Sequence, residues 1–271
     1  MRAVQSSVDT MYIDAHCHLT GEDYEEVGGV TAVLQRAKAE HMTRMVCSGF
    51  DVTSSMQACA LAEKFPEVYF CAGFHPSELN KYQEGDWEKL SALFSHEKCV
   101  AVGEIGLDYH FDDNPPKEMQ RACFIKQLEM AHEAKLPVVI HSRDSAQETY
   151  ELLIEHRELL QNGALLHCYS YSPEMAERFC ELDFYFSFGG PSTFKNAKKV
   201  FESVQRIPAH RILSETDCPY LTPAPFRGVF PNEPKNVPII VKRLAELKGI
   251  AETEMREILF ANAKRLFTKL K

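Results

Sequence analysis

Eight short apolar or β-branched runs recur along the chain, and each precedes a longer stretch with apolar residues at helical spacing. The runs lie at Met11–Asp14, Arg44–Ser48, Val68–Gly73, Val100–Glu104, Pro137–His141, Ala164–His167, Phe184–Phe188 and Arg211–Glu215. The helices are expected at about 26–40, 52–64, 86–96, 117–135, 144–159, 173–181 and 194–204, with a final helical region at about 236–270. Strands that alternate with helices in this way form a parallel sheet, and eight units over 271 residues match the size of a closed barrel. We therefore predict an α/β protein, a single (β/α)8 TIM-like barrel domain spanning residues 1–271.

Two segments support the prediction of a single barrel. Pro137 ends the helix before the fifth run, and the fully apolar Val138–Ile140 is typical of a strand that is buried on both faces. The stretch Pro219–Pro238, after the eighth run, is rich in proline and has no periodicity. We predict that it is a functional loop at the carboxyl end of a strand rather than a linker between domains.

Charge and cysteine content restrict the class of protein. Lys and Arg number 30 against 39 Asp and Glu, and the net charge of −9 disfavours a broad basic surface for long nucleic acids. Bound divalent cations would reverse the local sign, so a polyanionic substrate stays open. The nine cysteines include no C-x-x-C pair, which favours reduced thiols packed as small apolar groups.

No apolar run has the length of a membrane span, and residues 1–9 contain no apolar signal core. We therefore expect a cytoplasmic protein with no membrane partner. No obligate protein partner is evident either.

Metal-binding residue types gather where five of the predicted strands end. In Asp14–His18, strand alternation places two imidazoles on the same side. The other candidates at strand ends are Glu104, His141, His167 and Asp217. In a barrel these ends form one face, whereas chance would scatter such residues over both ends and the helices. The sequence thus predicts a metal centre, although a lone His-x-His would be no more than a polar turn.

Four histidines and two carboxylates are too many ligands for one catalytic metal with an open position, and they suit two metals. A carboxylate can bridge two metals and an imidazole cannot. We predict that the first metal is held by His16, His18, Asp217 and bridging Glu104, and the second by His141, His167 and Glu104. The ligand set suits Zn²⁺, Mn²⁺, Co²⁺ or Fe²⁺, and the carboxylates also allow Mg²⁺.

Six motifs in order resemble the TatD-type metal-dependent deoxyribonucleases, within the amidohydrolase-like barrel superfamily. They are Asp14–His18, Gly73–Pro76, Gly103–Tyr109, His141–Asp144, His167–Ser170 and Glu215–Pro223. The resemblance runs from about residue 11 to about residue 267, and the six predicted ligands match the family's. It implies a two-metal phosphodiesterase, often a 3′-to-5′ exonuclease, with DNA as substrate at single-stranded or frayed 3′ ends. The chain departs from the family's pattern at Cys71, Phe74 and Gly228–Pro231. The resemblance implies that these positions lie around the rim of the pocket, where they would affect which substrates bind.

The resemblance suggests roles for further residues. Asp217 would accept the proton of the attacking water or serve purely as a ligand. His75 would bind phosphate or protonate the leaving oxygen, unless it only caps the turn before Pro76. The planar fork of Arg143 suits phosphate. Three carboxylates are expected behind the ligands, orienting them: Asp14, Asp108 and Glu215.

Several alternatives stay open. An amidohydrolase or lactonase would use the same barrel on a C–N or C–O bond, but such relatives often bridge their metals with a modified lysine at the fourth strand, where this chain has Glu104. A non-catalytic binding barrel would not need a complete ligand set. Four aromatic residues either stack a base or pack in the core or rim: Tyr169, Tyr171, Phe194 and Phe226. Four basic residues either guide a nucleic-acid strand or are merely solvated: Lys195, Lys198, Lys199 and Arg206.

Overall fold

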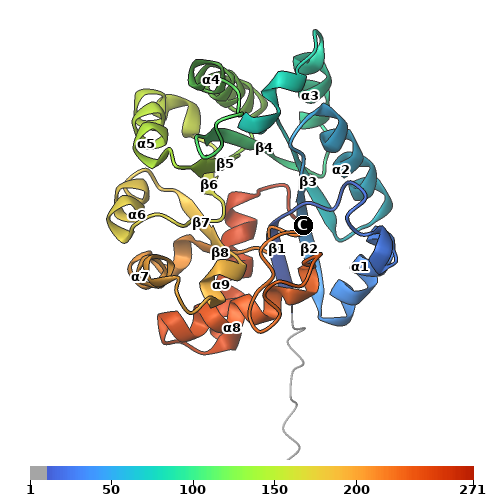
Figure 1. Cartoon of the computed structure of the whole chain (residues 1–271), viewed down its shortest axis with the longest axis vertical. Helices are drawn as coiled ribbons and strands as arrows, with labels where there is room; N and C mark the ends of the chain where they lie inside the picture. Colours follow the sequence, from blue (N-terminus) through green and yellow to red (C-terminus); the bar gives the residue numbers. More distant parts are fainter. Residues whose placement is uncertain (1–10) are drawn as a thin grey trace, which may run out of the picture.

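The computed structural model describes residues 11–271, which form a barrel of eight parallel strands surrounded by helices (Figure 1). Each strand pairs with the next along the chain. The strands are β1 (Tyr12–Cys17), β2 (Met42–Ser48), β3 (Val68–Ala72), β4 (Cys99–Asp108), β5 (Val138–Arg143), β6 (Ala164–Leu166), β7 (Tyr185–Phe188) and β8 (Ile212–Ser214). Between β8 and β1, the Ser214 hydroxyl donates to the Ile13 carbonyl at 2.9 Å, so the barrel is nearly closed. The predicted TIM-like barrel is confirmed, while the expectation about residues 1–9 lies outside the described residues.

The helices follow the strands as predicted, except in the last region. They are α1 (Gly29–Ala39), α2 (Val52–Lys64), α3 (Asp86–Phe94), α4 (Lys117–Ala134), α5 (Ala146–Glu155), α6 (Pro173–Cys180), α7 (Lys198–Arg206), α8 (Val237–Lys248) and α9 (Glu252–Leu266). The final region is thus two helices. Gly249 ends α8 in the left-handed conformation, at φ 67°, which glycine adopts without steric cost.

Strand β4 is longer than predicted and carries Glu104 in its interior rather than at its end. It continues alongside β5 as far as Asp108. Gly106 permits this course, because its φ is 143° and a Cβ there would lie 1.9 Å from the carbonyl oxygen of His141. The close approach of the two strands places Glu104 and His141 near each other.

The amino-terminal end of the barrel is filled by the last helix. One core cluster joins buried residues from all eight strands with Leu266, Phe267 and Leu270, at and beyond the end of α9. The Lys271 backbone N–H also donates to the Tyr69 hydroxyl at 3.2 Å, near the start of β3. Because this apolar plug covers one end, only the carboxyl ends of the strands face an accessible mouth.

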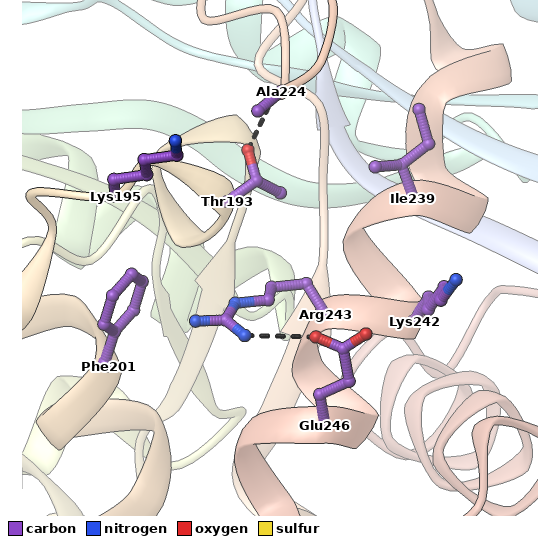
Figure 2. Close-up of a pocket in the computed structure, with 8 residues that line it drawn as sticks. All are labelled: Thr193, Lys195, Phe201, Ala224, Ile239, Lys242, Arg243 and Glu246. Carbon is purple, nitrogen blue, oxygen red and sulfur yellow. Dashed lines mark hydrogen bonds and ion pairs between the residues drawn. The ribbon is translucent and has the colours of Figure 1, made fainter.

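Two further features concern membranes and small ligands. Over residues 11–271, no helix has both the length and the apolar character needed to cross a bilayer. A recess of about 530 Å³ lies between α7 and α8 (Figure 2), and none of the predicted ligands lines it. Its lining residues are Thr193, Lys195, Phe201, Ala224, Ile239, Lys242, Arg243 and Glu246.

Candidate metal centre

The barrel brings the six predicted ligands together at the carboxyl ends of its strands. His16 lies in β1 and His18 just after it, Glu104 in β4, His141 in β5, His167 directly after β6 and Asp217 after β8. Asp217 has a left-handed backbone, at φ 53°, and its N–H donates to the His16 carbonyl at 3.0 Å. This contact holds the start of the loop after β8 against the end of β1.

Four donor atoms form a first group. Oxygen Oε2 of Glu104 lies 3.3 Å from His16 Nε2 and 3.4 Å from His18 Nε2. Asp217 Oδ1 lies 3.6 and 3.4 Å from the same two nitrogens, which are 3.2 Å apart. Ligands about 2.1 Å from a tetrahedral Zn²⁺ stand roughly 3.4 Å from one another. The spacing of the group therefore fits a single divalent cation.

The other oxygen of the same carboxylate serves a second group. Glu104 Oε1 lies 2.9 Å from His141 Nδ1 and 2.7 Å from His167 Nε2, and these two nitrogens are 3.2 Å apart. Three protein ligands leave a further coordination position for water or substrate. Each oxygen of Glu104 therefore faces a different imidazole pair, which is the arrangement expected of a carboxylate between two cations, and the bridge stays a prediction.

The electrostatics of the cluster favour an ionised Glu104. Burial alone would raise its pKa, but the neighbouring His167, His16 and His75 hold that pKa well below the usual range. Burial lowers the pKa of His16 to about 4, which favours the neutral imidazole that coordinates metals. Against the effect of burial, Asp217 raises the pKa of His18 to about 9 and Glu104 raises that of His167 to about 10, so a cation bound at these nitrogens would displace their protons.

Asp108 lies behind His141, and its role in orienting this ring stays a prediction. Its Oδ2 is 3.0 Å from His141 Nε2, which leaves Nδ1 of the ring facing Glu104. Asp108 is itself fixed through its backbone, because its N–H donates to the Gln120 side chain at 2.8 Å and its carbonyl accepts from the same amide at 2.9 Å. A carboxylate in this position sets the orientation and the basicity of the imidazole.

Asp14 and Glu215 lie behind the ligands without a hydrogen bond to an imidazole within residues 11–271, and their orienting roles stay predictions. Asp14 accepts hydrogen bonds from the backbone N–H groups of Thr216, at 2.9 Å, and His16, at 3.3 Å, so it joins β1 to the end of β8 without touching an imidazole. Glu215 is 3.9 Å from His167 Nδ1, too far for a hydrogen bond. Burial raises its pKa to about 8.

His75 fits both interpretations offered by the sequence. Its Nδ1 accepts from the Ser77 backbone N–H at 3.2 Å and caps the 3₁₀ helix Pro76–Lys81. Its other nitrogen, Nε2, lies 3.6 Å from Glu104 Oε1. The capping role leaves one nitrogen facing the cluster, and the catalytic role stays a prediction.

Arg143 lies at the end of β5, on the rim. Its side chain is exposed, and the guanidinium sits 5.0 Å above the ring centre of Phe111, which is itself half exposed. Within the described part of the chain it forms no hydrogen bond or ion pair with a predicted ligand. Its proposed contact with phosphate stays a prediction.

Ser48 is the residue that the sequence analysis missed. At the end of β2, its carbonyl oxygen is 3.0 Å from His18 Nδ1, and its hydroxyl is 3.1 Å from His16 Nδ1. One residue therefore orients both imidazoles so that their Nε2 atoms face Glu104. Its position could have identified it as a site residue, because Ser48 is a polar residue at the carboxyl end of a predicted strand.

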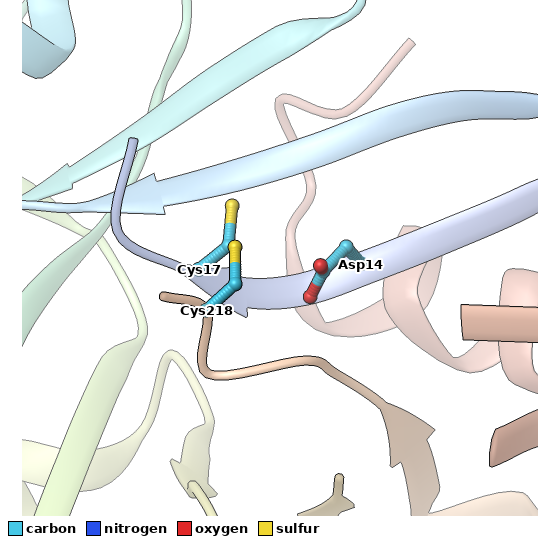
Figure 3. A group of neighbouring side chains, drawn as sticks. All are labelled: Asp14, Cys17 and Cys218. Atoms are coloured by element: carbon cyan, nitrogen blue, oxygen red, sulfur yellow. The ribbon is translucent and has the colours of Figure 1, made fainter. Parts of the chain in front are cut away.

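Two thiols lie behind the first group, on the far side of β1. Cys17 and Cys218 are buried side by side near Asp14 (Figure 3). Burial raises the pKa of the Cys17 thiol. Both oxygens of Asp14 already accept hydrogen bonds, Oδ1 from the backbone N–H groups of Thr216 and His16 and Oδ2 from the Thr216 hydroxyl. These thiols are apolar filling rather than metal ligands, and all nine cysteines are free, as predicted.

Similarity to known proteins extends over nearly the whole chain. Residues 13–268 match the profile of the family described as TatD related DNase. The chain belongs to this family. It is 42% identical to a Bacillus subtilis (strain 168) protein described as uncharacterized metal-dependent hydrolase YabD, over 95% of this chain and 99% of the relative.

Two Escherichia coli proteins extend the comparison. The K12 protein described as uncharacterized metal-dependent hydrolase YcfH is 35% identical over 94% of this chain and 95% of its own length. The crystal structure of YJJV, a TatD homolog from strain K12, superposes with a TM-score of 0.88 at 31% identity, covering 95% of this chain and 98% of that one. The protein is therefore a metal-dependent hydrolase of the TatD family, in which buried His and Glu clusters offer a metal site.

Asp108 provides a first test of the centre in this TatD-family barrel. We expect Asp108→Asn to weaken metal binding at the second group by about 10- to 100-fold, since the amide loses the charge that orients His141. Titration of the metal-free protein with Zn²⁺ would measure the affinity, with the exposed Asp112→Asn as a matched control. Unchanged affinity in Asp108→Asn would contradict the role given to this carboxylate.

Proposed function

We propose that the protein is a DNA phosphodiesterase with two divalent cations, and that it removes nucleotides from single-stranded or frayed 3′ ends. The observation that supports this proposal best is Glu104, whose two oxygens each face a separate pair of imidazoles. Two-metal centres are typical of enzymes that displace an alkoxide from phosphorus. Membership in the TatD-related DNase family supports DNA as the substrate.

The cations are Zn²⁺, Mn²⁺ or Mg²⁺ on the chemistry of the ligands. When bound, two such cations lower the pKa of a shared water and neutralise charge on the phosphoryl oxygens. The residues of the chain hold and orient the reactants. His16, His18 and Asp217 would bind the first cation, and His141 and His167 the second, with Glu104 between them.

Three residues would act on the substrate or its protons. Asp217, whose Oδ1 belongs to the first group, would take the proton of the attacking water or serve purely as a ligand. The free Nε2 of His75 would bind a phosphoryl oxygen or donate to the leaving alkoxide. Arg143, on the rim, would hold the next phosphate of the strand with its planar fork.

Metal removal tests the proposal. Metal-free protein is expected to hydrolyse a 3′-labelled single-stranded oligonucleotide at least about 10³-fold more slowly than the metal-loaded protein, and Mn²⁺, Mg²⁺ or Zn²⁺ should restore the rate. A 3′-to-5′ exonuclease releases the labelled nucleotide first. Full activity after verified metal removal would refute the mechanism, and cleavage of a lactone panel without cleavage of the oligonucleotide would favour the amidohydrolase alternative.

A further inference from the structure

The loop between β8 and α8 exposes an unusual amount of apolar surface. Of the large hydrophobic side chains that are exposed within residues 11–271, five lie in this one loop: Tyr220, Leu221, Phe226, Val229 and Phe230. As whole residues, Tyr220, Phe226 and Phe230 are each at least half exposed, at 56, 50 and 58%. Scattered exposed apolar residues need no explanation, but a cluster of them on one segment marks an interaction surface.

The loop is held in place by buried polar contacts. The side-chain amide of Asn232, which is fully buried, donates to the carbonyls of Tyr220 at 2.7 Å and Thr216 at 3.1 Å. Farther along, the backbone N–H of Ala224 donates to the Thr193 hydroxyl at 2.8 Å (Figure 2). The exposed rings therefore stand on an anchored backbone, which reduces the entropy lost when a ligand binds to them.

The same loop begins at the candidate metal centre. The Tyr220 N–H donates to the Asp217 carbonyl at 3.1 Å. The ring centres of Tyr220 and Phe230 are 6.4 Å apart. The aromatic surface thus adjoins the place where the reaction would occur.

Charge around the mouth favours one direction for a polyanion. The segment between β1 and α1 exposes four carboxylates: Glu22, Asp23, Glu25 and Glu26. Ala224 of the loop instead borders the recess of Figure 2, which contains Lys195, Lys242 and Arg243. Arg243 pairs with Glu246 at 3.1 Å, whereas no ion pair of Lys195 or Lys242 occurs in the described part of the chain.

We propose that Tyr220, Phe226 and Phe230 form a platform on which bases of a single-stranded DNA substrate stack, with its phosphates running toward the recess between α7 and α8. The proposal rests on the proposed function and assigns the residues that hold the strand. Every base has a π face, so such a platform binds strands without reading sequence. It also explains how a protein of net charge −9 can hold DNA while contacting few phosphates.

The test compares a normal oligonucleotide with one of equal length that lacks the bases upstream of its 3′-terminal nucleotide. For the metal-loaded wild type, kcat/KM should be about tenfold or more higher on the normal strand, since each stacked base contributes roughly 5- to 150-fold in affinity and the platform offers three rings. In the double variant Phe226→Ala/Phe230→Ala this ratio should fall toward one. Val229→Ala, from the same loop and 57% exposed, is the matched control and should keep the wild-type ratio.

Other outcomes separate this platform from the proposed function. An unchanged ratio in the double variant, with the oligonucleotide still cleaved, would overturn the platform alone. If no strand is cleaved with any metal, the proposed function fails, and fluorescence anisotropy with the same two strands then decides the platform: equal affinities would overturn it. If the double variant differs from the wild type in oligomeric state by sedimentation, and its ratio of kcat/KM values on the two strands is unchanged, the platform is overturned. The loop would then be a contact between copies of this chain.

Discussion

Replacing Glu104 with alanine is expected to lower kcat/KM on an oligonucleotide by about 10³-fold or more, and further than His141→Ala does. The reason is that the oxygens of Glu104 face both imidazole pairs, at 2.7 to 3.4 Å, whereas His141 belongs to the second group alone. Each metal contributes several kcal/mol of charge stabilisation in the transition state, and each 1.4 kcal/mol changes the rate about tenfold.

Measuring the metal content of both variants together with their rates distinguishes loss of both metals from loss of one. Glu104→Ala should retain less metal at both groups, while His141→Ala should keep the metal bound near His16 and His18. Glu84→Ala, at an exposed position, is the control for the loss of a carboxylate, and circular dichroism would verify that each variant is folded. Equal metal content and equal rates in Glu104→Ala and His141→Ala would contradict the bridge.

The barrel could be predicted because its strands are buried on both faces. A run such as Val138–Ile140 has no polar alternation, and proline before it ends the preceding helix. Strand ends were harder to place. The extension of β4 past Glu104 depends on the contact of Gly106 with the backbone of β5, which no local pattern in the sequence reveals. The division between α8 and α9 was readable at Gly249, a frequent helix terminator.

The convergence of the six candidate ligands could be predicted because parallel strands bring their carboxyl ends to one face. What the sequence could not provide was the register between neighbouring strands. Ser48 orients two imidazoles only because β2 lies beside β1, and Asp14 meets Thr216 only because β8 closes onto β1. Of the four aromatic candidates for base stacking, Tyr169 is in the core and Phe226 is exposed, a distinction that depends on packing rather than residue type.

A circular single-stranded DNA is expected to resist hydrolysis by the Mn²⁺-loaded protein. A linear oligonucleotide of the same sequence should instead be shortened progressively. The net charge of −9 precludes neutralising many phosphates at once. The side chains of the candidate ligands are at most about one-sixth exposed. The scissile phosphate must therefore enter the barrel mouth to reach them. A free terminus can do so without bending the strand on both sides, whereas the interior of a circle cannot.

Salt dependence gives this argument a second measurement. On single strands the logarithm of the affinity falls by about 0.7 per neutralised phosphate for each tenfold rise in salt. Contact with three phosphates, namely the scissile one, the next one at Arg143 and one near the recess between α7 and α8, therefore predicts a slope of about −2. A much steeper slope would indicate extensive contact with the backbone, which the acidic surface opposes. Cleavage of the circle as fast as the linear strand would identify an endonuclease, and the requirement for a free terminus would then be wrong even if the two-metal chemistry were right.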